Sequence, residues 1–365
     1  MDVFFSYYLQ FFKDNGINDS IALILWYLIS FLLVAVFLVF VVIILVLAER
    51  KILARFTVRK GPNRVGFGGC LQTVADAIKL LLKEDIIPIG ANKILFSLAP
   101  ILVFAPIMFV WYLIPFNSRF VVFNSAVGVL IFMAFLSFPI LGVLLAGYSS
   151  NNKYSLIGAM RSCIQTISYE LPLFMSVLSI VVLAGSLNIN SIILSQSSSS
   201  GLFGWYFISS LLGLMVFFVS SLAQMNRTPF DLPEAESELV CGYNTEYSGM
   251  KFAMFFLGEY AETFIISVFL VCLFFGGYLS PFGTYIAENF SLNYVLTQFL
   301  VYLEQTFWLI LKTSIVILLI IWVRATLPRL RSDQLTEFAW KILLPISIVN
   351  FFIVAIVKFS GMAVI

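Results

Sequence analysis

The residues best able to carry chemistry lie in one short, acidic stretch between long apolar runs. Only 11% of the chain is charged, yet one arginine and five carboxylates fall within residues 226–247: Arg227, Asp231, Glu234, Glu236, Glu238 and Glu246. On a helix, Glu234 and Glu238 share one face, where like charges repel by about 0.2–0.5 kcal/mol. Packed carboxylates raise one another's pKa, which is what a proton relay requires. A solvated acidic loop is the alternative interpretation.

Four further charges lie inside apolar runs. Glu170 occurs in the segment SYELP, Glu259 and Glu262 share one face of a later run, and Lys312 lies in the next. A charge at the bilayer centre costs about 2.5–3.5 kcal/mol on insertion scales. These side chains should therefore face one another, water or a partner. We expect functional roles for the three glutamates and a structural counter-ion role for Lys312.

Other kinds of site have little support in the sequence. The chain has no histidine, and its four cysteines (70, 163, 241 and 272) lack metal or redox spacing, so zinc, haem and histidine-based catalysis are not expected. A GFGG segment at 66–69 is not followed by the Gly-Lys-Ser/Thr of a phosphate loop. No basic run suits nucleic acid. We expect no metal site and no nucleic-acid partner.

The elements that must position these residues are membrane helices. The chain is 61% hydrophobic, with a mean hydropathy of +1.03, whereas soluble domains are about 45–50% apolar. Its apolar runs are continuous over about 20 residues, which favours helices over a barrel. We predict an all-α integral membrane protein in one domain, residues 1–365: a bundle of about eight transmembrane helices with amphipathic or short helices in the inner loops. The expected spans are 22–48, 94–115, 121–147, 160–185, 203–224, 251–279, 299–324 and 340–361.

The distribution of positive charge predicts the orientation of these spans. Of the 21 Lys and Arg residues, 17 fall in four loops, 49–93, 148–161, 225–251 and 324–341. Only Lys13, Arg119 and Lys358 fall on the other side. Positive loops stay on the cytoplasmic or matrix side, so we expect these four loops inside and the N-terminus outside.

Local patterns predict some structure within the inner loops. A Gly61-Pro62-Asn63 turn precedes an amphipathic segment, residues 71–83, which on the simplest interpretation is a helix lying along the membrane interface. Asp231 with Glu234 forms a D-x-x-E capping box, and Pro233 fits the first helical turn. A helix is therefore expected to start at Asp231.

Specific motifs follow one another through all four inner loops. The first loop has Glu49-Arg50-Lys51, Arg59-Lys60-Gly61-Pro62-Asn63, Leu71-Gln72, Ala75-Asp76 and Lys79-Leu80. The second has Gly147-Tyr148-Ser149-Ser150-Asn151 with Lys153-Tyr154, followed by Ser168-Tyr169-Glu170. The third is the acidic stretch, through Phe256-Leu257-Gly258-Glu259-Tyr260. The fourth has Arg324-Ala325-Thr326-Leu327-Pro328-Arg329 and Asp333-Gln334-Leu335. In order and content these motifs resemble membrane subunit 1 of respiratory complex I, the NADH:ubiquinone oxidoreductase.

The resemblance implies a core membrane subunit that forms much of the ubiquinone access channel, anchors the peripheral arm and links quinone reduction to proton pumping. By resemblance, the residues that line or brace the quinone channel are Arg50, Arg59, Asp76, Phe230 and Arg324. Those of the proton path are Glu170, Glu236, Glu238, Glu246 and Glu259, to which we add Glu262. Structural roles in the inner loops fall to Glu49, Gly61, Pro62, Asn63, Arg227, Asp231, Glu234, Arg329 and Asp333.

The resemblance also implies substrate, partners and place. Ubiquinone would be a bound substrate, nothing would be held covalently, and FMN and the iron–sulfur clusters would belong to other subunits. The chain would not be catalytic alone. Its partners would be other membrane-arm subunits, the quinone-site subunits of the peripheral arm, and lipids. We expect the mitochondrial inner membrane, with the N-terminus in the intermembrane space, because heavy use of Phe and Ile suits an AT-rich organelle genome. The bacterial plasma membrane is the alternative.

The chain departs from the family pattern at several positions. Gln224 replaces a common Glu, Glu262 a common Asn, and Thr57 a common Gln, while Leu330 and Ser332 stand where tyrosines are usual. We hypothesise that Glu262 partly compensates for the acid missing at 224. Two other functions stay open: a secondary transporter, which the lack of an internal repeat disfavours, and a purely structural anchor, which would need no buried acids.

Overall fold

The computed structural model describes residues 19–118, 121–197, 201–232, 241–283, 285 and 294–360. Regular structure in these residues is helical throughout, which confirms the predicted all-α class. Among them, seven helices are long and apolar enough to cross a membrane, and α10 (Leu211–Gln224) is apolar but shorter. The single domain stays a prediction.

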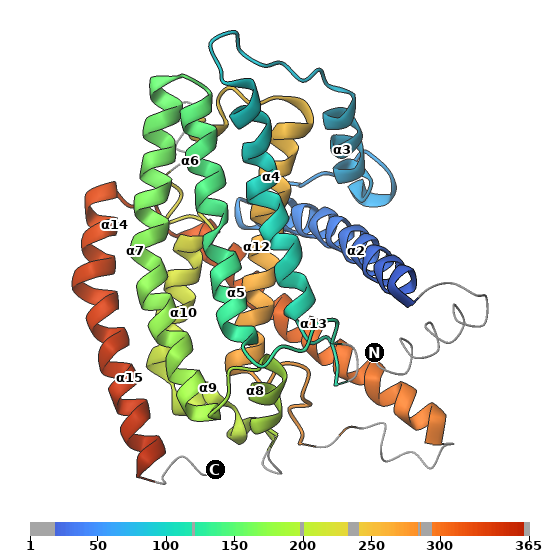
Figure 1. Ribbon diagram of the computed structural model, residues 1–365, viewed down its shortest axis with the longest axis vertical. Coiled ribbons are helices and arrows are strands. Elements are labelled where there is room, and N and C mark those ends of the chain that lie inside the picture. Colours follow the sequence, from blue (N-terminus) through green and yellow to red (C-terminus); the bar gives the residue numbers. More distant parts are fainter. Residues whose placement is uncertain are drawn as a thin grey trace.

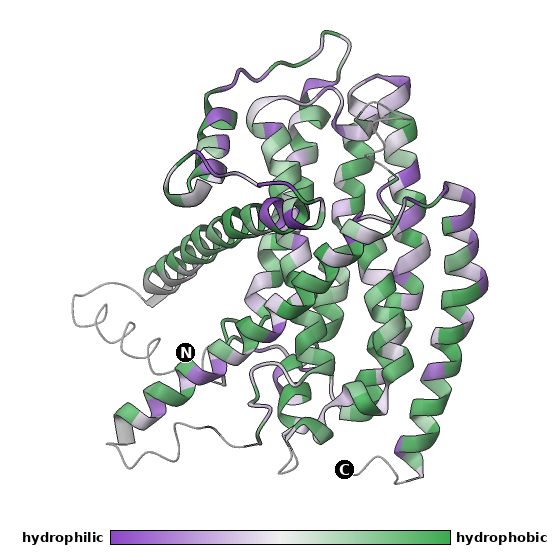
Figure 2. Ribbon diagram, turned by 180° about the vertical axis from the view of Figure 1, so that it is seen from behind, coloured by the Kyte–Doolittle hydropathy of each residue, from purple (hydrophilic) through white to green (hydrophobic). Residues whose placement is uncertain are grey.

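The helices form an upright bundle with two inclined helices against one side (Figure 1). The bundle contains α4 (Lys93–Val110), α5 (Gly128–Ser137), α6 (Pro139–Ser149), α7 (Lys153–Ala184), α10 and α12 (Gly249–Phe274), and α15 (Leu344–Phe359) packs on α7. The inclined helices are α2 (Asp19–Phe56) and α13 (Tyr294–Thr326), and α3 (Gln72–Leu82) lies beside α2. Figure 2 shows that α2 is hydrophobic over most of its length, as expected of a surface in contact with lipid, and hydrophilic at the end beside the bundle.

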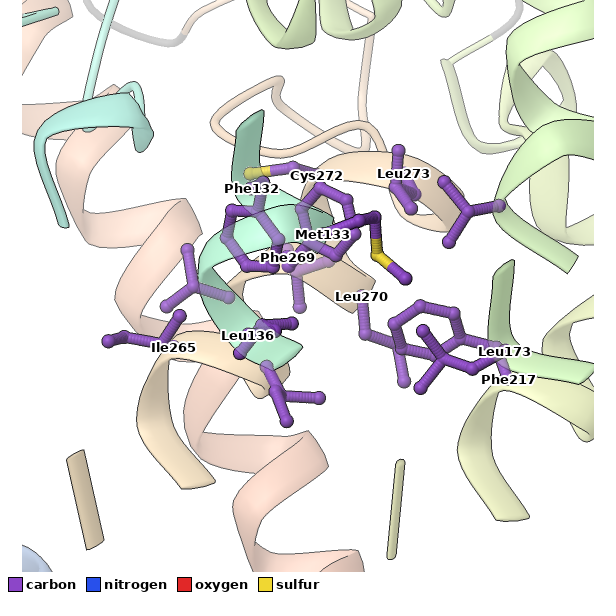
Figure 3. Close-up of a cluster of buried hydrophobic side chains, with 14 of the residues drawn as sticks. Phe132, Met133, Leu136, Leu173, Phe217, Ile265, Phe269, Leu270, Cys272 and Leu273 are labelled. Atoms are coloured by element: carbon purple, nitrogen blue, oxygen red, sulfur yellow. The ribbon is translucent and has the colours of Figure 1, made fainter. Parts of the chain in front are cut away.

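The apolar core lies between α5, α7, α10 and α12 (Figure 3). Phe132 of α5 stacks on Phe269 of α12 with ring centroids 3.7 Å apart. Phe217 of α10 packs against the same helix, with its ring centroid 5.7 Å from that of Phe274. In the most apolar 18-residue stretch of α12, 72% of the residues are buried, whereas in the corresponding stretch of α2 only 11% are buried. The central helix therefore fixes the positions of the acids that it carries.

Expected spans 203–224 and 340–361 are each interrupted by a stretch that is not α-helical. Span 203–224 divides into η3 (Gly201–Gly204), α9 (Tyr206–Ser209) and α10, with Ser210 between them in a non-helical conformation (φ −136°, ψ 55°). Span 340–361 follows α14 (Ser332–Phe338) through a π-helical turn, η6 (Ala339–Leu343), into α15. Pro345 stands in the first turn of α15; because it has no N–H, the local hydrogen-bond ladder must rearrange, and a π turn is a common solution.

Asparagines cap the helices that follow the first two inner loops, and a backbone hydrogen bond from one of them joins the two loops. Asn92 accepts from Ile94 N at 3.2 Å and so starts α4, and Asn152 accepts from Tyr154 N at 3.0 Å and starts α7. Such caps satisfy backbone N–H groups that have no partner within the helix. The backbone N–H of Asn92 also donates to Ser149 O at 3.1 Å. Loops 49–93 and 148–161 therefore meet at one end of the bundle.

Lys312 binds the chain at the C-terminal end of α12, at the opposite end of the bundle from these loops. Its ammonium group donates to the carbonyl oxygens of Phe275, Gly277 and Leu279 at 2.8, 3.0 and 2.7 Å. It also lies 4.0 Å from the centre of the Trp205 ring. A cation is favourable where helix carbonyls lack partners. Lys312, expected as a counter-ion, is thus bound by the carbonyls that follow α12.

A close approach between α4 and α6 gives a test of the bundle. A Cβ at Gly142 would lie 2.5 Å from Val103 Cγ2 and 2.9 Å from its backbone N, whereas one at Gly128 would meet Ile189 Cγ1 at 3.5 Å, an ordinary contact. We expect Gly142→Ala to destabilise the protein by about 1–3 kcal/mol through overpacking, with little effect of Gly128→Ala. Thermal unfolding in detergent measures both, and equal melting temperatures would contradict the packing described.

Candidate functional site

A buried ion cluster joins three of the four inner loops. Glu49, near the end of α2, has 7% of its side chain exposed and accepts from Arg227 Nη1 at 3.1 and 3.2 Å. Arg324, at the end of α13, makes an ion pair with the same carboxylate. Removing a charge from water costs several kcal/mol unless a well-placed partner compensates. One carboxylate between two guanidinium groups therefore holds together chain segments that are far apart in sequence.

Arg227 connects the ion cluster to α12. Its guanidinium lies 4.3 Å above the centre of the Tyr260 ring, an attractive cation–π geometry. It also donates to Thr263 Oγ1 at 3.5 Å, and Thr263 in turn donates to Glu259 O at 2.8 Å. The cluster is thus in contact with the helix that bears two of the expected proton-path acids.

Two of these acids bind polar side chains from other inner segments. The hydroxyl of Tyr243 donates to Glu259 Oε1 at 2.8 Å, and the amide of Asn152 donates to Glu246 Oε1 at 2.8 Å. Glu246 and Asn152 line an open, polar cavity of about 350 Å³ between the first, second and third inner loops. Both carboxylates are therefore held in place, one half-buried and one facing an open surface.

The remaining acids differ in their surroundings. Glu170 is half-buried in α7 and accepts a hydrogen bond from Ser137 of α5. Glu262 is buried in α12 with 8% exposure. Gln224 donates to Leu136 O at 3.3 Å, next to the serine that binds Glu170. Glu234, Glu236 and Glu238, with the helix start expected at Asp231, fall in residues 233–240, outside the described residues.

A narrow crevice borders the ion cluster. Its polar lining comes from Glu49, Arg227, Tyr260, Thr263 and Arg324, and its apolar lining from Leu45, Ile317, Ile320 and Ile321. The volume is about 10 Å³, the space of about one water molecule. The chain thus sets two guanidinium groups beside an apolar wall, without enclosing a larger molecule there.

The expected quinone-channel residues occupy separate places. Arg50 and Asp76 form an ion pair between the end of α2 and α3, and Gln72 also donates to Asp76 at 3.2 Å. Arg59 is exposed and donates to Thr57 Oγ1 at 3.1 Å. Only Arg324 of the expected set belongs to the ion cluster described above.

Phe230 and several residues expected to have structural roles make contacts within and between the inner loops. Phe230 is 3% exposed, with its ring 5.2 Å from Tyr169, so it lies in the core. Arg329 binds Asp231 at 3.0 Å and so joins the fourth loop to the third, whereas the pair between Arg331 and Asp333 is exposed.

The Gly61-Pro62-Asn63 turn folds back on the end of α2 and on a later glycine. A Cβ at Gly61 would lie 3.2 Å from Lys51 Cα. At Gly69, which has φ +80°, a Cβ would lie 2.1 Å from Pro62 O, so no larger residue fits there without a shift. The turn therefore has a structural role in placing the first inner loop.

Several partners of the acids were not selected from the sequence. They are neutral side chains: Ser137, Asn152 and Tyr243. The signal that could have found Ser137 is a polar residue inside an apolar helix, since such residues bond across helices. Asn152 and Tyr243 lie in loops, where polar residues are ordinary. Within the described chain no group of three metal-ligating side chains occurs.

Comparisons with known proteins agree with the inner-loop motifs. The family model described as NADH dehydrogenase matches residues 29–355. An NADH-quinone oxidoreductase subunit of Bacillus cytotoxicus, the one designated H, is 49% identical over 314 residues, which cover 86% of this chain and 88% of that protein. The proteins of the same description from Bacillus mycoides and Bacillus thuringiensis are 48% identical over the same lengths.

The Arg50–Asp76 pair predicts a response of α3 to acid. Partial burial acts to raise the pKa of Asp76, but the hydrogen bonds from Arg50 and Gln72 outweigh it and hold that pKa below the ordinary 3.8. A carboxylate with a lowered pKa stabilises the fold above its ordinary pKa, and the contribution is lost as pH falls through the lower value. We expect α3 to become more mobile over this acidic range.

A dye on the exposed Cys70, just before α3, reports the greater mobility as a fall in fluorescence anisotropy below pH 3.8. Buried Cys163 and Cys272 stay unlabelled, and Cys241→Ser removes the fourth thiol. In the control Asp76→Asn the anisotropy should be low and independent of pH. A pH response that persists in this variant would exclude Asp76 as its source.

Proposed function

The chain belongs to the NADH dehydrogenase family, which confirms the resemblance seen in its inner loops, and we propose that it is the membrane subunit of a proton-translocating NADH:quinone oxidoreductase, equivalent to the Bacillus proteins compared above. It takes part in oxidoreduction as one part of that complex and is not catalytic alone. The observation that carries the proposal is the Glu49–Arg227–Arg324 cluster, which sets cationic donors beside an apolar wall in a chain of this family.

On the quinone side, the chemistry of the cluster fits a quinone with an apolar tail. Guanidinium N–H groups are suitable donors to quinone carbonyl oxygens, and the isoleucines of α13 offer the apolar surface that an isoprenoid chain needs. A crevice of about 10 Å³ is too small for the ring. The ring is therefore held where the peripheral-arm subunits cover the inner loops, with Arg50, Arg59, Asp76, Phe230 and Arg324 lining or bracing the channel.

On the proton side, the proposed path contains Glu170, Glu236, Glu238, Glu246, Glu259 and Glu262. The support is that hydroxyl groups bind two of the acids: Tyr243 binds Glu259, and Ser137 binds Glu170. A hydroxyl can both donate and accept a proton, which a relay requires. Because Arg227 lies against Tyr260 on the same helix as Glu259, a change of charge at the quinone can alter the field at this acid.

The proposed substrate is ubiquinone, and the partners are the other membrane-arm subunits and the quinone-site subunits of the peripheral arm. FMN and iron–sulfur clusters are assigned to those partners. The relatives compared above are bacterial, which supports the bacterial plasma membrane over the mitochondrial inner membrane. The four positively charged loops are placed on the cytoplasmic side of that membrane, with the N-terminus outside.

Glu49→Gln tests the ion cluster. It keeps the size of the side chain but leaves two guanidinium groups without their carboxylate, and breaking a buried pair costs about 3–5 kcal/mol. We expect NADH:quinone reductase activity to fall by more than about tenfold, while oxidation of NADH by an artificial acceptor, which needs no quinone site, is retained. Glu337→Gln is the control, because its pair with Lys341 is exposed and such pairs contribute about 0–1 kcal/mol. Equal effects of the two variants would refute the proposal.

Glu259→Gln and Glu170→Gln test the proton path. Each variant keeps an acceptor for the hydroxyl that binds the acid but can no longer exchange a proton. We expect quinone-dependent proton pumping to fall by more than about tenfold in fully assembled complex. Glu304→Gln is a matched control, since that carboxylate also accepts from an aromatic side chain, Trp308, at 3.3 Å. Normal pumping in both test variants would favour a purely structural anchor.

A further inference from the structure

One buried glutamine binds the segment that carries Arg227. Gln165 of α7 is 1% exposed, and the two N–H groups of its Nε2 are shared among three acceptors: Ala223 O at 2.8 Å, Asn226 Oδ1 at 3.1 Å and Phe230 O at 2.6 Å. These acceptors belong to the end of α10 and to the loop that follows it. A single amide on α7 thus contacts the chain both before and after Arg227.

The bound segment is a tight turn. The N–H of Arg227 donates to Leu222 O at 3.1 Å, and the N–H of Phe230 donates to Arg227 O at 2.8 Å. Asn226 has a positive φ of 49°, which few residues other than Gly, Asn and Asp adopt readily. Because Gln165 binds both arms of this turn, it limits how far Arg227 can move relative to α7.

The helix that carries Gln165 is a firm reference for that turn. Tyr169, one helical turn later, packs against Phe230 with ring centroids 5.2 Å apart and donates to Leu335 O at 2.9 Å. Glu170 follows on the same helix. A displacement of the turn would move the guanidinium away from Glu49 and from the Tyr260 ring, two contacts that depend on distance and angle.

We propose that Gln165 is a positioning residue for the quinone site: it holds the Arg227 turn so that the guanidinium reaches Glu49 and Tyr260. The inference rests on the proposed function, because it takes Arg227 as part of the quinone side. Gln165 acts through the backbone of the turn and does not itself contact the quinone. A neutral amide suits this task, since its two N–H groups bind oxygen atoms on both sides of the turn without adding a charge. Its own Oε1 is buried and has no hydrogen-bond partner among the described residues.

A second glutamine provides a matched control at the other end of the bundle. Gln196, which ends α8 (Ile189–Ser195), is also 1% exposed. Its Nε2 donates to the backbone carbonyls of Ile192, Cys272 and Leu273 at 3.2, 3.1 and 3.2 Å. The number of acceptors and the burial match those of Gln165, and Gln196 Oε1 also accepts from Tyr206 N at 3.3 Å and Gly276 N at 3.0 Å. Gln196 binds α12 at its C-terminal end, after the proposed site residues that this helix carries.

The experiment compares Gln165→Met with Gln196→Met in the intact complex. Both variants lose a buried amide with three acceptors, and Gln196→Met also removes the acceptor of two backbone N–H groups, so the fall in melting temperature should be at least as large in Gln196→Met. The KM for a short-chain quinone should rise about tenfold or more in Gln165→Met and stay within about twofold in Gln196→Met. Oxidation of NADH by an artificial acceptor should be unchanged in both. Equal quinone KM values in the two variants would overturn the proposal.

Hydrogen exchange of residues 222–232 separates this proposal from the proposed function. Faster exchange at Arg227 and Phe230 in Gln165→Met supports the positioning role, and unchanged exchange overturns it, whatever the quinone kinetics show. Asn226→Gly, which keeps the positive φ but removes one acceptor, should give intermediate exchange and KM; it decides the question if Gln165→Met does not assemble. If Glu49→Gln leaves quinone reduction intact, the proposed function fails, while the exchange result still shows whether Gln165 fixes the turn.

Discussion

The buried carboxylate of Glu49 is the constraint on which the inner end of the molecule depends. It lies 178 positions from Arg227 and 275 positions from Arg324 along the chain, yet it pairs with both. Glu49 and Arg227 are buried and offset each other's charge, and Arg324, about one-third exposed, pairs with the same carboxylate. This matters most for α2, because only 11% of its most apolar window is buried. In lipid, apolar contact between helices gives little net attraction, so polar contacts at the inner end must fix its position.

The same rule explains three polar contacts made at helix ends. Lys312 binds three carbonyl oxygens that follow α12, Gln196 binds two at the end of the same helix, and Gln165 binds the chain where α10 ends. Backbone groups at a helix end lack partners within the helix, and in a membrane no water replaces them. Side-chain donors therefore both satisfy the backbone and join one helix to the next.

Hydropathy was sufficient to predict the helices but not their interruptions. The second expected span, 94–115, corresponds closely to α4 with the short turn after it, Lys93–Leu113. The break at Ser210 was not predicted. Its hydroxyl contacts Ser179 and Asn350 from two other helices, and hydropathy carries no information on such contacts. The ion pairs could not be predicted either. Family resemblance selected Glu49, Arg227 and Arg324 as separate residues, but periodicity carries no information on pairing across 275 positions. Gln165 was missed because a neutral amide carries no charge, and the residues singled out within the spans were the charged ones.

The choice between charged and neutral groups follows from what each can do near the bilayer. An ion pair is strong but responds to any change of charge nearby, so the Glu49 cluster is coupled electrically to whatever binds beside it. A neutral amide holds geometry without such a response. The structure uses both on the same turn: Arg227 faces the ion cluster, while Gln165 binds the backbone on either side of it. A turn fixed by neutral hydrogen bonds can present a charge at a constant position, so that a change of charge at the site alters the local field rather than the fold.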